Sequence, residues 1–186
     1  MLYNIINEFE ENYEVIMENI KELKEKFINL TPNQWDAIPD IDLYMDQVIT
    51  YMQRQHIGLD DRETLTPAMI NNYIKSELLP RAKGKRYSRE HIAYLTAICL
   101  LKQVLSVGDT GALLHDQLEN KDIKDFYNNY STTLNKEFKK VSDQIDEDYS
   151  EEQLSQLAMQ LAISSYAEKL ACEKILDILT KGKDKG

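Results

Sequence analysis

The chain has 186 residues, of which 42% are hydrophobic, and its 22 Lys and Arg against 32 Asp and Glu give a net charge of −10. That apolar share is enough for a buried core and excludes an intrinsically disordered chain. No apolar run approaches the roughly 20 residues that span a bilayer, and the N-terminus is acidic where a signal peptide is basic. We therefore expect a cytoplasmic protein with no membrane partner.

The first predicted element is an amphipathic helix over residues 2–30. Its large apolar side chains recur at alternating spacings of four and three residues from Phe9 to Leu30, which is typical of a narrow, coiled-coil-like seam. Thr31 and Pro32 then read as a cap and a first-turn proline that open a short new turn. We assign residues 1–37 to this N-terminal part of the chain.

A second helix is predicted over residues 41–55, with Asp40 as its cap. Ile41, Tyr44, Val48 and Met52 recur on one face, which we expect to be buried. After a polar link, Thr66 and Pro67 predict the start of a short helix that Pro80 prevents from continuing.

Next comes a basic loop, RAKGKRY, whose glycine suits a tight hairpin. Ser88 can cap the following helix, which is apolar almost all round and is expected to end near Gly108. Further helices are predicted over residues 110–119 and 121–145, and a capping box of Ser150 and Gln153 opens the last one. The predicted boundaries are 38–116 for a central domain and 117–186 for a C-terminal helical region.

The sequence gives no signal of catalysis or of metal binding. It lacks the GxSxG, HExxH and glycine-rich phosphate-loop motifs, its three histidines are scattered, and His91 is expected on the surface of a first helical turn. Cys99 and Cys172 lie in apolar helical stretches and are expected to be buried hydrophobes. We expect no enzyme activity, no cofactor and no metal.

Charge is distributed unevenly along the chain. Residues 64–102 contain seven Lys and Arg against two acids, a local balance of +5 that leaves −15 on the remainder. The order of elements here is helix, link, short helix, basic glycine-containing loop and buried helix, which indicates a winged helix-turn-helix. A cluster of cations on an acidic chain favours a polyanionic partner at this place.

The short helix presents a candidate recognition face. If Ile70, Tyr73 and Ile74 point inward, the opposite face carries side chains at positions i, i+3, i+4 and i+7. Asparagine can bind an adenine edge at two points, alanine can touch a thymine methyl, and lysine can reach phosphate or guanine. The loop cations would meet the flanking phosphates. The candidate DNA-binding residues are Thr66, Ala68, Asn71, Asn72, Tyr73, Lys75, Arg81, Lys83, Lys85, Arg86 and Arg89. Tyr73 is equally compatible with a place in the core.

Three phrases carry a family resemblance. Residues 73–80 (YIKSELLP), 84–88 (GKRYS) and 101–106 (LKQVLS) resemble the DNA-binding domain of the mercury-resistance-regulator (MerR) family. Residues 38–114, with MINNYIK, LLP and GKRYSREHI, resemble more closely an uncharacterised Firmicutes family described as a domain of unknown function. Asn71 departs from the arginine that is usual in MerR-type helices, and Glu77 departs from the glycine before Leu-Leu-Pro, so contacts cannot be transferred base for base.

The expected fold is mostly α, with a MerR-like winged helix-turn-helix and a short β-wing embedded between an N-terminal helix and a C-terminal helical region. The resemblance implies a transcriptional regulator that binds double-stranded DNA sequence-specifically as a homodimer. Two alternatives stay open. One is an adaptor that docks a protein partner through the same domain. The other is a sensor that holds an apolar small-molecule effector in the helical region.

Overall fold

The computed structural model describes residues 2–55, 65–119 and 121–183, with side chains from Val15 to Gly182 within those ranges. The fold is mostly α, as predicted. Its elements are α1 (Leu2–Asn29), the 3-10 turn η1 (Trp35–Ala37), α2 (Met45–Gln55), α3 (Pro67–Lys75), α4 (Arg89–Leu101), α5 (Val107–Leu118), α6 (Ile123–Ser142) and α7 (Glu151–Lys183). Within the described ranges, no helix is long and apolar enough to cross a membrane.

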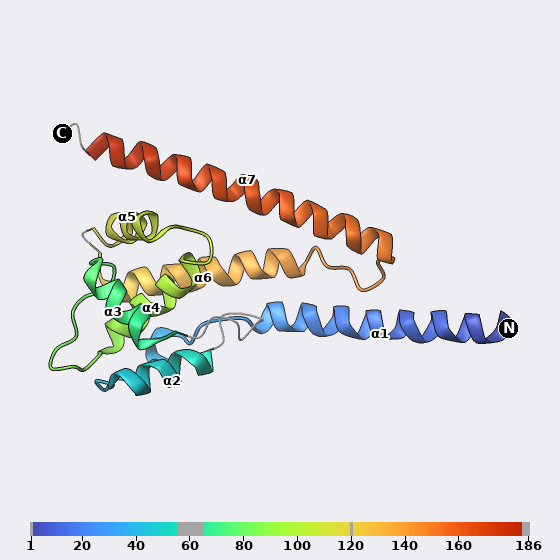
Figure 1. Cartoon of the computed structure of the whole chain (residues 1–186), viewed down its shortest axis with the longest axis horizontal. Coiled ribbons are helices and arrows are strands. Elements are labelled where there is room, and N and C mark those ends of the chain that lie inside the picture. The colour runs from blue at the N-terminus through green and yellow to red at the C-terminus, as the bar shows by residue number, and fades with distance from the viewer. Residues whose placement is uncertain (1, 56–64, 120, 184–186) are drawn as a thin grey trace.

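The helices α2 to α5 gather at one end of the molecule, while α1, α6 and α7 run along its length (Figure 1). From Ile16 to Phe27, the apolar seam predicted for the first helix packs along α6, where the rings of Phe27 and Phe138 meet edge to face at 5.7 Å; the side chains of Phe9 and Tyr13 lie outside the described residues. Lys24 Nζ lies 3.5 Å from a carboxylate oxygen of Glu147 beside this contact. The seam therefore has a partner within the chain.

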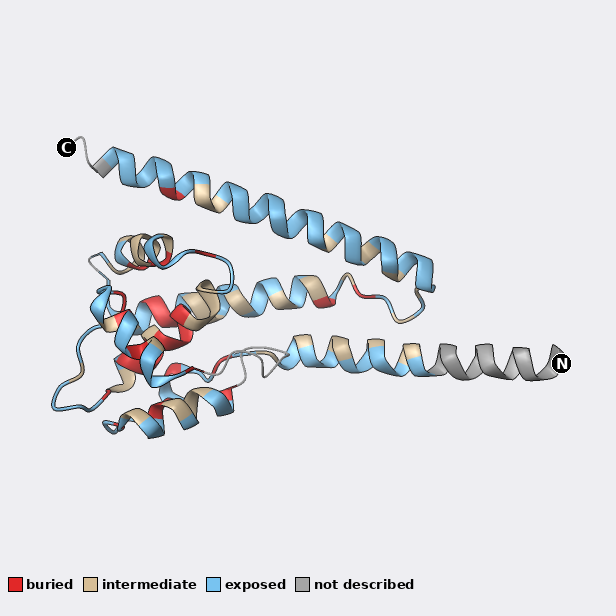
Figure 2. Ribbon diagram, viewed as in Figure 1, coloured by how far each residue is buried: buried red, intermediate tan, exposed pale blue. Residues whose placement is uncertain are grey.

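The core centres on α4, whose side chains are buried on several faces, as its near-continuous apolar sequence predicts. Ala93, Leu95, Ala97 and Ile98 are fully enclosed there. The buried cluster begins at Trp35 of η1 and ends at Phe126 and Tyr127 of α6 (Figure 2). Elements on both sides of α2–α5 thus contribute to one core.

The start of α2 differs from the prediction. The helix begins at Met45 rather than at residue 41, and the side chain of Gln47, not Asp40, accepts a hydrogen bond from the Tyr44 N–H at 2.9 Å. Residues before it are held extended because Leu43 and Tyr87 exchange both backbone hydrogen bonds, at 2.9 and 2.8 Å. This pairing competes with helix formation and leaves Ile41 and Tyr44 exposed, where burial was expected.

At other helix ends, the capping side chains mark the boundary better than the glycines do. Gly108 lies inside α5, because Ser106 caps that helix by accepting the Asp109 N–H at 3.1 Å. The capping box of Ser150 and Gln153 is formed as predicted, with bonds of 2.9 and 3.3 Å. Thr31 does not act as a cap, since η1 begins only at Trp35.

The predicted β-wing does not form strands in the described residues. The basic loop contains one isolated bridge, Lys83 with Arg86, and Tyr87 pairs with Leu43 instead of extending that hairpin. Pro80 has no N–H to contribute to a longer ladder. The loop is therefore a tight turn flanked by short extended segments that do not form a β-ladder.

Candidate nucleic-acid interface

The helix α3 begins as the sequence predicts. Thr66 caps it by accepting the Met69 N–H at 3.2 Å, and Pro67 occupies the first turn. Ile70 and Tyr73 are buried, and this orientation leaves the opposite face to solvent. The exposed residues on that face are Ala68, Asn71, Asn72 and Lys75.

The end of α3 is a Schellman turn with glutamate in the glycine position. The Leu78 N–H donates to the Tyr73 carbonyl at 2.9 Å, and the Glu77 N–H donates to the Ile74 carbonyl at 3.2 Å. Glu77 has a φ of +59°, in the left-handed region. A side chain there costs roughly 1–2 kcal/mol relative to glycine. The turn directs Leu78 and Leu79 into the core and leads the chain into the basic loop.

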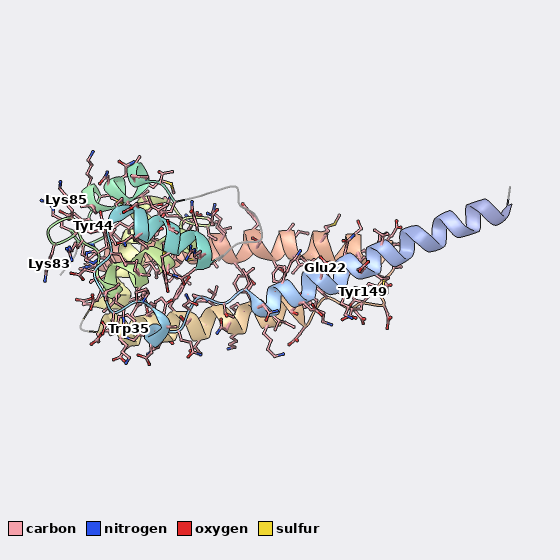
Figure 3. The ribbon with its side chains drawn as sticks, turned by 90° about the horizontal axis from the view of Figure 1, so that it is seen from below. Glu22, Trp35, Tyr44, Lys83, Lys85 and Tyr149 are labelled. Carbon is pink, nitrogen blue, oxygen red and sulfur yellow. The ribbon has the colours of Figure 1, made fainter. Side chains whose placement is uncertain are left out.

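The tip of the basic loop is a two-residue turn. Gly84 and Lys85 both have positive φ, +58° and +64°, and the Arg86 N–H donates to the Lys83 carbonyl at 3.0 Å. Two successive positive φ values define a type I′ turn, which matches the twist of a hairpin. Lys83 and Lys85 are exposed at the end of the molecule (Figure 3).

Arg86 is held by a neighbour that the sequence did not identify. Its Nη2 donates to the Tyr44 hydroxyl at 3.0 Å, and its guanidinium lies 5.0 Å from the centre of the Tyr44 ring. Tyr44 is exposed beside the loop because α2 begins one residue later. The signal that could have found it is Gln47, a capping residue three positions after Tyr44.

Two predicted contact residues have other roles. Tyr73 is 6% exposed and belongs to the core cluster, which favours the core alternative for this ring. Arg89 extends toward Asp40, at 3.5 Å, and its guanidinium lies 5.7 Å from the centre of the Trp35 ring. Its side chain is only 18% exposed, and these contacts connect it to the segment before α2. The exposed candidates are therefore Thr66, the α3 face, and the loop cations Arg81, Lys83, Lys85 and Arg86.

The family described as "Domain of unknown function (DUF1836)" matches residues 33–130, just over half of the chain. The chain belongs to this family. The match confirms the resemblance to a domain of unknown function, while the likeness to MerR proteins stays a prediction. No curated protein and no solved structure matches the chain.

The DUF1836 match and the buried core have nearly the same limits. The Tyr127 hydroxyl donates to the backbone carbonyl of Asn33 at 2.7 Å, which joins the start of the matched region to its last helix. The candidate interface, from Thr66 to Arg86, lies wholly within this DUF1836 domain.

A hollow of about 440 Å³ lies beside the interface in the same domain. Its walls come from the end of α3, the Schellman turn, and α5, and they include Ile74, Lys75, Glu77, Leu78, Leu114 and Leu118. Lys75 borders both this hollow and the exposed face of α3.

In the described part of the chain, no group of three or more His, Cys, Asp and Glu is placed to hold a metal ion. Cys99 and Cys172 are half-buried and form no disulfide bond in the described residues.

His91 is buried, whereas the sequence placed it on the surface. Its Nδ1 accepts the Ser88 N–H at 3.1 Å in the capping box of α4, and its ring meets Tyr87 edge to face at 5.5 Å. Burial lowers the pKa of His91, although the nearby carboxylates of Glu90 and Asp42 act in the opposite direction. The neutral imidazole is the form that caps the helix.

We expect the DUF1836 domain to lose stability as the pH falls below about 6.5, the ordinary pKa of histidine. The unfolded chain binds a proton there that folded His91 resists, so the stabilisation is complete above this pH and declines below it. His91→Gln retains a capping-box acceptor and cannot be protonated. Urea unfolding at pH 7.5 and 5.5 should show a smaller pH effect in this variant than in the wild type. An equal pH effect in both proteins would assign the dependence to other groups.

Proposed function

We propose that the DUF1836 domain is a non-enzymatic, MerR-like DNA-binding domain, and that the chain is a transcriptional regulator that reads duplex DNA. The supporting observation is the juxtaposition of an exposed Ala-Asn-Asn-Lys face on α3 with a projecting loop of cations. Both lie at the same end of a chain whose other regions are acidic.

The chemistry of the α3 face suits base edges in a major groove. Asn71 and Asn72 each offer an amide that can pair with the two polar atoms of an adenine edge. Ala68 is small enough for close approach and can contact a thymine methyl. Because α3 is fixed at both ends by its cap and its Schellman turn, the face is presented with little freedom of orientation.

The chemistry of the loop suits phosphates. Lys83 and Lys85 extend from the type I′ turn, and Arg86 is oriented by Tyr44. A cation that contacts the backbone positions the protein without reading sequence. In this proposal the turn replaces a full β-wing, and its short arms still bring the cations beside α3.

The acidic remainder of the chain supports a single mode of docking. A balance of −15 outside residues 64–102 repels polyanions from the other surfaces, while +5 attracts them here. Because operators are commonly read as paired half-sites, we propose that the protein acts as a homodimer. The hollow between α3 and α5 offers a site for a small-molecule effector, since a molecule there would touch Lys75.

The test is binding of genomic DNA fragments as a function of salt, followed by sequencing of the fragments retained. We expect binding that weakens as salt rises, and each of Lys83→Gln and Lys85→Gln should reduce the log–log salt slope by about 0.9. Lys136→Gln is the matched control, because Lys136 is an exposed lysine on α6. Absence of salt-dependent binding would refute the proposal. Loop variants that bind DNA normally but lose a protein partner would establish the adaptor function instead.

A further inference from the structure

The outer side of α7 carries large apolar side chains that the rest of the described chain does not cover. Met159, Ile163, Tyr166 and Leu170 are 66%, 64%, 69% and 41% exposed. They follow one another at spacings of four, three and four residues, so they form one line along the helix. We name these four residues the α7 stripe. A contiguous exposed apolar patch of this kind marks an interaction surface.

The opposite side of α7 already has a place in the fold. The helix packs on α5, above which its C-terminal part runs (Figure 1), and Leu176 in that part is buried. Leu154, Leu157 and Leu161 are half-buried on the same side as Leu176. At 100° per residue the stripe points away from this side, so α7 is apolar on two faces. A helix of that kind is normally packed on both.

We propose that the α7 stripe binds the same stripe of a second copy of this chain, with the two α7 helices antiparallel. A two-fold axis between residues 164 and 165 places Ile163 opposite Tyr166 and Met159 opposite Leu170. Both pairings are apolar, and each occurs twice, as an isologous interface requires. The spacing of the stripe is that of a knobs-into-holes seam.

Charge favours this orientation over a parallel one. The start of α7 carries Glu151 and Glu152, and the acidic turn before it contains Asp146 and Asp148, whereas Lys174 and Lys181 lie toward the other end. A parallel pair would place each group beside its own copy. The antiparallel pair sets Glu152 opposite Asp177, with Lys174 and Lys181 each within one helical turn, so each Glu152 meets two lysines of the second copy and one carboxylate. Opposite charges that flank an apolar seam select orientation.

The other long apolar seam of the chain is not available for this role. The stripe from Ile16 to Phe27 on α1 faces α6 and is half-buried against it. Among the side chains that the structure describes, α7 rather than α1 therefore offers a second copy an uncovered apolar face. The interface lies outside the DUF1836 match, which ends at residue 130.

The α7 dimer also sets the spacing of the two DUF1836 domains, and the meaning of that spacing rests on the proposed DNA-binding function. The antiparallel pair sets Leu176 opposite Gln153 of the second copy, so the two Leu176 positions are about 34 Å apart along the helices at 1.5 Å per residue. This end of α7 adjoins α5 of the DUF1836 domain. A separation of about 34–36 Å is one turn of B-DNA, the spacing of paired half-sites. Because the α7 stripe points away from the side of α7 that packs on α5, the two domains also lie on opposite sides of the α7 pair, so their separation is at least this distance.

The dimer is tested in the absence of DNA, so that a failure to dimerise can be told apart from a failure to bind DNA. Light scattering of the full chain at tens of micromolar should give twice the 21.7 kDa mass of one chain. Ile163→Lys should raise the dissociation constant by roughly 100-fold or more, because the side chain is buried twice in the dimer. Ile163 is exposed in the single chain, so helicity measured by circular dichroism should not change. Ser164→Lys, which adds the same charge on a different face of the helix, should remain dimeric. A monomeric wild type, or a dimer unaffected by Ile163→Lys, would overturn the proposal.

Orientation is tested by disulfide trapping in a chain that carries Cys99→Ala and Cys172→Ser. Met159→Cys and Leu170→Cys are made as separate proteins of different tag length and then mixed under oxidising conditions. The antiparallel pair predicts the mixed disulfide as the main product, because residue 159 of one copy faces residue 170 of the other. Met159→Cys chains that link chiefly to themselves would show a parallel pair and overturn the assigned orientation.

Discussion

Alanine in place of Asn71 or Asn72 is expected to weaken binding to the preferred DNA site by roughly 1–3 kcal/mol, which is about 5- to 150-fold. Binding to random duplexes should change little, because base-edge contacts discriminate between sequences whereas phosphate contacts do not. Both side chains are exposed on α3 and lie outside the core, so the variants should fold normally. Fluorescence anisotropy with a selected site and a scrambled site of equal length measures the two losses.

A matched control is Asn135→Ala, which truncates an exposed asparagine on α6 and should leave both affinities unchanged. An equal loss on selected and scrambled DNA would make Asn71 and Asn72 phosphate ligands. No loss on either would remove the α3 face from the interface. The comparison with Lys83→Gln and Lys85→Gln therefore separates recognition by the helix from positioning by the loop.

Local chemistry made the candidate interface predictable to a large extent. Thr66 and Pro67 define the start of α3, and the inward turn of Ile70 leaves Asn71 and Asn72 exposed. These signals act within a few residues of one another, so a single sequence contains them in full. The same holds for the capping box of Ser150 and Gln153.

Features that depend on distant partners were missed. Leu43 pairs with Tyr87, and this contact between residues far apart in the chain delays α2 and exposes Tyr44. Arg89 was assigned to phosphate because it follows the basic loop, but Asp40 and Trp35 hold it. Periodicity and local charge carry no information on such pairs.

The apolar seams also show that a sequence pattern does not identify the partner of a helix face. The spacing from Phe9 to Leu30 predicted a helix with a narrow, coiled-coil-like apolar face, and the helix is present. From Ile16 to Phe27 this face packs on α6, where Phe27 meets Phe138. A pattern reveals that a face needs a partner without saying whether the partner belongs to the same chain. Among the described side chains, the α7 stripe is the apolar face that a second copy can cover.

Trp35→Ala is expected to destabilise the protein by about 3–5 kcal/mol, the usual cost of removing a large aromatic side chain from a core. Trp35 is 8% exposed, and its ring meets that of Tyr127 edge to face at 5.9 Å. It also lies against the guanidinium of Arg89, which would lose that contact. The sequence boundary between residues 37 and 38 would place this tryptophan outside the central domain, whereas the buried cluster includes it. Urea unfolding followed by circular dichroism measures the change in the free energy of unfolding.

Asp36→Ala is the control on the same turn. Asp36 is exposed, and its ion pair with Lys124 is long, at 3.7 Å, so this variant should change stability by less than about 1 kcal/mol. If η1 were a surface appendage, both variants would have small effects and α2–α5 would unfold with an unchanged midpoint. A large loss for Trp35→Ala alone, in one cooperative transition, would show that the turn before α2 and the helix α6 stabilise the same core that supports the α3 face. The recognition surface would then depend on contacts made at both limits of the DUF1836 domain.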